Sequence, residues 1–161
     1  MGKTVSIRPA SPNDVGAILE MVRELAEYEN LLHQCVATER QFKQALFDPS
    51  PRVEALVGEL DAAPVAFALF FHNFSTFLGK PGLYLEDLYV KPPFRGRGFG
   101  KALLKKLAQI AVERGCGRFE WTVLNWNEPA IRAYDSIGAI SLDDWTIRRL
   151  EGEKLQKLAE S

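Results

Sequence analysis

The sequence predicts a mixed α/β fold whose central sheet is mostly antiparallel. Three consecutive segments have strand character, and the third leads through a glycine loop and a helix into another strand, as in a parallel crossover. The 161 residues are 47% apolar and 25% charged, which is typical of one soluble domain with a full core. We therefore expect a single domain over residues 1–161.

Two helices are predicted near the start of the chain, after a first strand at residues 4–8. Ser11 is a helix N-cap with Asp14 in the capping-box position, and an apolar stripe with helical spacing follows to about residue 30. Thr38 begins a shorter helix that ends near Phe47, before two prolines. The segment between the helices, residues 30–37, has no clear periodicity and is a candidate substrate entrance.

The remaining elements alternate between strands and helices. Residues 53–60 and 64–74 read as a strand hairpin, residues 75–82 as a loop, and residues 83–90 as another strand. After the glycine loop, a helix ends at Gly115. The expected order is then a strand at 118–124, a helix at 127–137, at least one strand within 139–150, and a short helix at 153–159.

Composition excludes several classes of function. The formal net charge of −1 favours binding neither to nucleic acid nor to an anionic membrane. Two cysteines and two histidines do not make a metal site or a disulfide framework. The chain begins without an apolar signal region and has no run long enough to span a membrane. We expect a cytoplasmic protein without a metal.

The glycine loop at residues 95–101 is the main candidate for a binding site. Gly96, Gly98 and Gly100 allow backbone N–H groups to approach one point at the start of a helix, which favours a phosphate. Arg95, Arg97 and Lys101 add positive charge there. Any tight turn between a strand and a helix also uses glycines, so the loop by itself is equally consistent with a structural role.

Two familiar phosphate motifs do not fit this loop. A dinucleotide fingerprint needs a glycine where Lys101 stands. A P-loop needs Ser or Thr at Ala102 and a glycine at Arg95. The pattern that remains is Arg-x-x-Gly-x-Gly, with its glycines at Gly98 and Gly100.

This pattern resembles the pyrophosphate-binding signature of the GNAT superfamily, N-acetyltransferases that use acetyl-coenzyme A. Further segments resemble the branch that acetylates diamines (spermidine and spermine) and thialysine, and these segments are 7–10, 24–29, 83–87, 126–129, Tyr134 and 138–139. The resemblance implies a mixed sheet that splays open beside the glycine loop, with coenzyme A in the gap. It also implies a homodimer and a small-molecule amine as acceptor.

The resemblance assigns chemical roles to two residues. Glu86 corresponds to the residue that takes the proton from the amine, through water, and Tyr134 to the general acid for the thiolate. The pattern alone slightly favours an anchoring carboxylate for Glu86, and it favours a core aromatic for Tyr134. The role of Asp87 and the direct or water-mediated action of Glu86 stay open.

The resemblance also implies contacts with both substrates. The expected acetyl-coenzyme A contacts are Leu88, Tyr89, Val90, Arg95, Gly96, Arg97, Gly98, Phe99, Gly100, Lys101, Asn127, Glu128, Pro129 and Ala130. The expected acceptor contacts are Tyr28, Glu29, Glu86, Glu120 and Trp121, because carboxylates with aromatic walls suit a cationic amine. The segment after Glu29 is less acidic than a polyamine site would favour, which leaves thialysine, other amino acids and short diamines open. The alternative is a non-catalytic domain that binds or senses acyl-coenzyme A.

Overall fold

The computed structural model of the protein describes residues 5–161, and the chain divides into two units at Thr122. Thr4, where the first strand is expected to start, lies outside the described residues. The first unit contains the sheet and the glycine loop, and the second begins at Val123. The expectation of a single domain stays a prediction.

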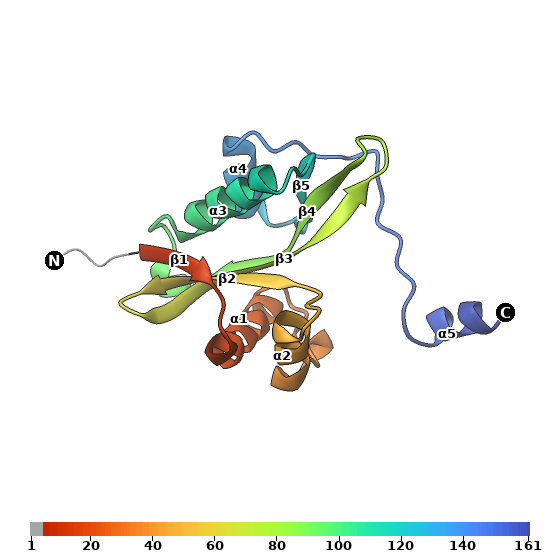
Figure 1. Ribbon diagram of the computed structural model, residues 1–161, viewed down its shortest axis with the longest axis horizontal. Helices are drawn as coiled ribbons and strands as arrows, with labels where there is room; N and C mark the ends of the chain where they lie inside the picture. Colours follow the sequence, from red (N-terminus) through yellow and green to blue (C-terminus); the bar gives the residue numbers. More distant parts are fainter. Residues whose placement is uncertain (1–4) are drawn as a thin grey trace. The chain divides into compact units, whose positions relative to one another are not determined.

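One five-stranded sheet forms the centre of the first unit (Figure 1), with its strands side by side in sequence order. The strands are β1 (Val5–Pro9), β2 (Glu54–Leu60), β3 (Ala63–Ser75), β4 (Lys80–Val90) and β5 (Arg118–Trp121). β1 to β4 are antiparallel to their neighbours, whereas β5 runs parallel to β4 after the crossover through the glycine loop. The predicted mixed, mostly antiparallel sheet is confirmed.

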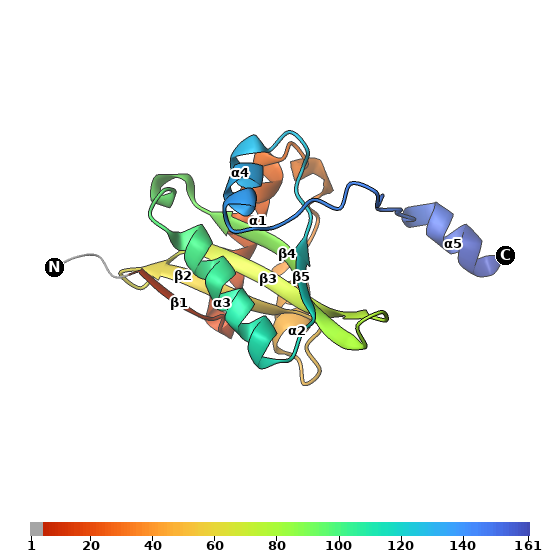
Figure 2. The same ribbon diagram turned by 90° about the horizontal axis from the view of Figure 1, so that it is seen from above.

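Helices cover both faces of this sheet, as Figures 1 and 2 show. α1 (Val15–Tyr28) and α2 (Glu39–Phe47) lie on one face, and α3 (Phe99–Glu113) lies on the other. Short 3-10 turns complete the connections at η1 (Pro12–Asp14), η2 (Leu32–Gln34) and η3 (Pro92–Phe94). None of the helices within residues 5–161 combines the length and the apolar character that a bilayer crossing requires.

Capping boxes stand at two of the helical starts that the sequence predicts, that of η1, which leads into α1, and that of α2. Both Ser11 with Asp14 and Thr38 with Gln41 form capping boxes, which satisfy backbone N–H groups that a helix start leaves unpaired. The Asp14 carboxylate also accepts two hydrogen bonds from Arg8, at 2.7 and 2.9 Å, so β1 and the start of α1 are joined.

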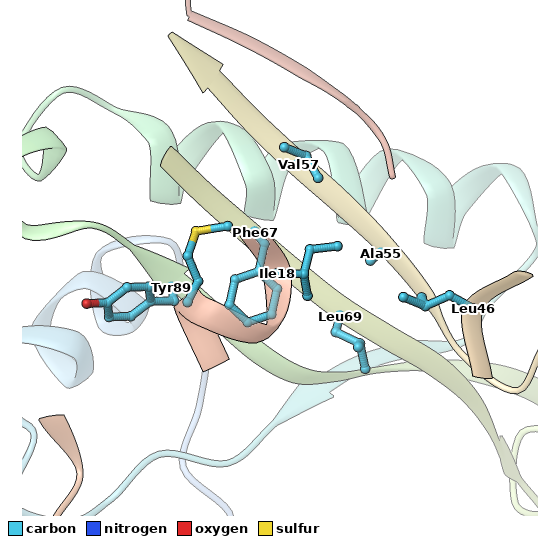
Figure 3. Close-up of a cluster of buried hydrophobic side chains, with 8 residues drawn as sticks. Ile18, Leu46, Ala55, Val57, Phe67, Leu69 and Tyr89 are labelled. Atoms are coloured by element: carbon cyan, nitrogen blue, oxygen red, sulfur yellow. The ribbon is translucent and has the colours of Figure 1, made fainter. Parts of the chain in front are cut away.

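The core between the sheet and the α1–α2 layer is drawn in Figure 3. Its buried side chains come from both helices and from β2, β3 and β4, and they are Ile18, Met21, Leu46, Ala55, Val57, Phe67, Leu69 and Tyr89. On the other face, α3 buries Phe99, Leu103 and Leu107. Packing of both layers holds the middle strands rigidly, and β4 carries the candidate site.

The predicted loop at residues 75–82 is wrong in extent. β3 and β4 stay paired out to Ser75 and Lys80, so only residues 76–79 form the turn. Pro81 and Gly82 look like loop residues in the sequence, yet both lie in β4. A side chain on Gly82 would collide with Asn73 and crowd Arg118, so the glycine lets neighbouring strands approach.

The second unit contains α4 (Glu128–Ser136) and α5 (Gly152–Glu160). The strand predicted within residues 139–150 is wrong, because the structure has no strand there. Apolar side chains in this segment are exposed, including Trp145 at 78% and Ile147 at 69%. An apolar pattern favours a strand, but a strand also needs a neighbouring edge for its hydrogen bonds.

Candidate active site

A β-bulge in the middle of β4 determines which way its acidic residues point. Leu69 of β3 pairs with Asp87, whereas the next residue, Phe70, pairs with Leu85, so Glu86 is the extra residue. Leu69 and Phe70 face opposite sides of the sheet, and their partners Asp87 and Leu85 therefore do so as well. Without the bulge, Asp87 would share the face of Leu85.

The bulge brings Asp87 to the face that α1 and α2 cover. Burial, followed by the charges of Glu86 and Glu29, raises the pKa of Asp87 to about 6. Burial also raises the pKa of Glu29, which directly follows α1. Glu86 itself is exposed. These three carboxylates, Glu29, Glu86 and Asp87, form an acidic cluster. Their negative charges suit a cationic ligand.

The edge of β4 is open beside this cluster. β5 pairs with β4 only from Gly82 to Leu85, so residues 86–90 have no strand on that side within the described part of the chain. Backbone N–H and C=O groups on such an edge bind an extended ligand as a further strand would. The sheet is splayed here, as predicted.

The glycine loop follows the open edge directly. Gly96 and Gly98 have φ of +73° and +87°, in the left-handed region that favours glycine. A side chain added at either position would meet no atom within 4 Å, so the space above both residues is open. Gly98 is also the N-cap of α3, a helix of 15 residues, and the loop therefore presents helix N–H groups toward an anion.

The basic residues of the loop differ in their contacts. The Arg95 Nε donates a hydrogen bond of 2.9 Å to the Val90 carbonyl, and its guanidinium carbon lies 5.3 and 5.4 Å from the ring centroids of Tyr28 and Tyr89. The Arg97 guanidinium lies 5.6 Å from the ring centroid of Phe94, within the same segment.

The end of β4 is joined to α1 by a second set of contacts. Lys91 Nζ lies 3.0 Å from carboxylate oxygens of both Glu20 and Glu24. Burial and a hydrogen bond with Glu24 raise the pKa of Tyr89. α1 is thus held against the strand that carries the acidic cluster.

The candidate acceptor residues of β5 already have partners. Arg118 Nε lies 2.7 Å from Glu120 Oε1, as an ion pair without hydrogen-bond alignment. The ring of Trp121 lies 4.9 Å from that of Phe119, centroid to centroid. The sequence shows Arg118 two residues before Glu120, the spacing that places both on one face of a strand, so this pair was detectable.

An apolar pocket of about 460 Å³ lies beside α2. Leu69, the cross-strand partner of Asp87, is one of its lining residues. Residues 34–37, part of the segment predicted to line a substrate entrance, line it together with residues of α2 and Val53.

The remaining predicted site residues belong to the second unit. The Asn127 side chain accepts a hydrogen bond of 3.4 Å from the Ala130 N–H and so caps α4, while Glu128 pairs with Arg132 at 3.3 Å. Pro129 lies in the first turn of α4, and Tyr134 is two residues from its end. Their roles toward coenzyme A and the thiolate stay predictions.

No group of three His, Cys, Asp or Glu is positioned to hold a metal ion within residues 5–161. The groups that the candidate site brings together are carboxylates, phenols and backbone amides.

Comparison with known proteins identifies relatives along nearly the whole chain. The model of the Acetyltransferase (GNAT) family matches residues 18–139. A thialysine N-epsilon-acetyltransferase from Sus scrofa is 40% identical, with 97% of this chain and 98% of the relative covered. An L-ornithine N5-acetyltransferase from Arabidopsis thaliana is 34% identical, with coverage of 94% and 86%.

A solved structure has the same fold. It is an integron cassette protein from the mobile metagenome of V. cholerae, with a TM-score of 0.82 and 29% identity over 99% of this chain and 100% of that one.

Proposed function

The chain belongs to the GNAT acetyltransferase family, and from this premise we propose that it moves the acetyl group of acetyl-coenzyme A to a primary amine of a small molecule. One observation carries the proposal. The edge of β4 at residues 86–90, which no strand within residues 5–161 pairs on that side, leads into a loop whose left-handed glycines stand at the N-terminus of α3. An extended amide arm and a pyrophosphate need these two features, next to each other.

The proposed cofactor contacts follow this arrangement. The backbone of Leu88, Tyr89 and Val90 would pair with the pantetheine arm. The loop from Arg95 to Lys101 would hold the pyrophosphate through its N–H groups, with Arg97 and Lys101 supplying charge. Asn127, Glu128, Pro129 and Ala130 are proposed as further contacts, on the family resemblance and on their place in the first turn of α4.

The proposed reaction is direct attack of the amine on the thioester. An alkyl ammonium with a pKa of about 10.4 must first lose a proton, which Glu86 accepts through a water molecule. The amine nitrogen then forms a bond to the acetyl carbon, the carbon–sulfur bond breaks, and Tyr134 gives its hydroxyl proton to the departing thiolate. The exposure of Glu86 at the bulge supports access to water.

The acidic cluster supports an acceptor with more than one polar group. Glu29 and Asp87 would pair with a cationic group of the acceptor, and Tyr28 and Trp121 would provide aromatic walls. Glu120 is proposed as a further acceptor contact, and its ion pair with Arg118 would hold its side chain in position. The relatives named for thialysine and ornithine favour a diamino acid as the acceptor. Short diamines and polyamines are the next candidates.

The apolar pocket supports the same class of acceptor. Its lining by Leu69 places apolar surface next to the cross-strand residue Asp87. A chain of methylene groups, with or without a sulfur atom, would bury its surface there while its cationic end stays with the carboxylates.

The test is thiol release from acetyl-coenzyme A with a panel of thialysine, lysine, ornithine, short diamines and spermidine, with products identified by mass spectrometry. Acetylation at an amine of one or more panel members is expected. Tight acetyl-coenzyme A binding without turnover across the panel would instead favour a non-catalytic binding or sensor domain.

We propose a homodimer as the working form. The exposed apolar side chains Ile140, Trp145 and Ile147 of the second unit support a partner surface there. The cytoplasmic location expected from the sequence stays a prediction.

A further inference from the structure

Arg95 lies in the cofactor loop, but its side chain leaves the loop. Its Nε reaches back five residues to the Val90 carbonyl at the end of β4. Its guanidinium then lies over the ring of Tyr89 in β4 and over the ring of Tyr28 in the last position of α1. A single side chain therefore connects the loop, the strand and the helix.

The two aromatic partners of Arg95 are held to different degrees. Tyr89 is 6% exposed and packs in the core with Ile18 and Phe67, so its ring is fixed. Tyr28 is 40% exposed, and it lies where α1 ends. Since helix ends fray, contact with Arg95 gives this ring a defined place relative to Tyr89.

The same contacts occupy the guanidinium. If its guanidinium moved away from these partners to a pyrophosphate, Arg95 would give up one hydrogen bond and two ring contacts, whereas Arg97 contacts only a ring of its own segment among the interactions the structure describes. All three basic residues are exposed, but Arg97 and Lys101 stand closer in sequence to the N-terminus of α3. They are the better charge partners for phosphate.

We propose that Arg95 is a positioning residue, whose side chain couples the cofactor loop to Tyr28 and Glu29 and so sets acceptor affinity. This inference rests on the proposed acetyltransferase function. The backbone of Arg95 keeps its place in the loop and contributes to acetyl-coenzyme A binding. Its side chain contributes to binding of the amine acceptor. Arg95 is planar and stacks on rings, and a lysine in its place does not reproduce both ring contacts.

The kinetic test compares Arg95→Met with Arg97→Met. Arg95→Met keeps the apolar stem and is expected to raise the KM of the best panel amine about 5- to 20-fold, as the loss of two ring contacts and a hydrogen bond implies. Its calorimetric affinity for acetyl-coenzyme A stays within about twofold. Arg97→Met is expected to weaken the affinity for acetyl-coenzyme A and to leave the KM of the amine nearly unchanged. Arg95→Lys is expected to recover little of the amine affinity that Arg95→Met loses.

A double-mutant cycle with Tyr28→Leu isolates the contact. In the Tyr28→Leu protein, Arg95→Met is expected to change the amine KM by less than about twofold, because the coupling is already lost. Thermal melting of each variant verifies folding. A weaker affinity for acetyl-coenzyme A in Arg95→Met, with an unchanged amine KM, would overturn the proposal and assign the guanidinium to the pyrophosphate.

Hydrogen exchange provides a measure that does not depend on turnover. Amides of residues 26–31 are expected to exchange several-fold faster in Arg95→Met than in the wild-type protein, and to be unchanged in Arg97→Met. Equal exchange in the wild-type and Arg95→Met proteins would also overturn the proposal. An inactive wild-type protein with the expected exchange pattern would instead refute only the proposed acetyltransferase function.

Discussion

Glu86 and Asp87 are neighbours in the sequence, but the β-bulge gives them different surroundings. Glu86 is exposed, whereas Asp87 faces the α1–α2 layer, where burial and two nearby carboxylates raise its pKa to about 6. A half-buried carboxylate among like charges reduces the free energy of unfolding. A residue that costs stability is expected to serve a ligand, and the acceptor ammonium is its natural partner.

The first prediction concerns Asp87→Asn. The folded pKa lies above the unfolded value of 3.8, so ionised Asp87 is unfavourable in the folded state above about pH 6, and this cost vanishes as pH falls below about 4. Asp87→Asn should therefore raise the free energy of unfolding by roughly 1–3 kcal/mol at pH 7 and change it little at pH 4. Amine affinity should fall. Chemical denaturation at both pH values measures the stability, and equal values for both proteins at pH 7 would contradict the assigned burial.

The second prediction concerns Tyr134→Phe, which keeps the ring and removes the hydroxyl. A general acid should lose about 10²- to 10⁴-fold in turnover, with little change in acetyl-coenzyme A affinity, because the proton moves only as the thiolate leaves. Steady-state kinetics checks this, with thermal melting as the control for folding. Near wild-type turnover would remove Tyr134 from the mechanism.

At the scale of elements, the loop before α3 combines an unusual backbone with open space. Gly98 has φ of +87°, and no atom lies within 4 Å of the position its Cβ would take. The protein therefore does not need a glycine there for packing. The remaining physical reasons for a glycine at position 98 are its backbone conformation and the approach of a ligand.

The third prediction follows from Gly98→Val, which should weaken acetyl-coenzyme A binding by about tenfold or more, since the side chain blocks the N–H groups. Gly79→Val is the matched control, because Gly79 also has positive φ and open space but lies in the β3–β4 turn. Calorimetry should detect weaker binding in Gly98→Val only. Equal affinity in both folded variants argues against the anion site.

The fourth prediction concerns the junction of β1 and α1. Arg8 holds the pKa of Asp14 at about 2, first through its hydrogen bonds, although burial acts in the opposite direction. Because the folded pKa is below the unfolded 3.8, this stabilisation is present above about pH 4 and is lost as pH falls toward 2.

Asp14→Asn should accordingly lower the free energy of unfolding by about 2 kcal/mol at pH 7, and by much less near pH 2. Denaturation curves at the two pH values provide the measurement. Glu39→Gln, at the first residue of α2, is a control that removes an exposed carboxylate. An equally large loss of unfolding free energy in Glu39→Gln would indicate a general effect of removing a negative charge.

For the whole molecule, the exposed apolar segment of the second unit leads to the fifth prediction. Trp145→Ser combined with Ile147→Ser should shift the mass in solution from dimer to monomer, since burial of these side chains against a second copy supplies the association energy. Light scattering measures the mass. A wild-type protein that is monomeric at micromolar concentration would exclude the dimer.

Local signals in the sequence determined most elements of this protein. The capping residues Ser11 and Thr38 specify helical starts through neighbouring backbone groups. Thr38 is the N-cap of α2, as predicted, and Ser11 is the N-cap of the 3-10 turn that leads into α1. The mixed sheet also followed from the order of elements. These features depend on contacts within a few residues, which a single sequence displays directly.

Only the tertiary structure decided how distant residues meet. The bulge at Glu86 exists because β3 and β4 pair in one register, and this register alone turns Asp87 toward Glu29. The partners of Arg95 come from α1 and β4, 67 and 6 positions away in the sequence, and no local pattern reveals them. The strand expected within 139–150 is absent because a strand forms only where another strand edge pairs with its backbone groups, and this too depends on residues distant in the sequence.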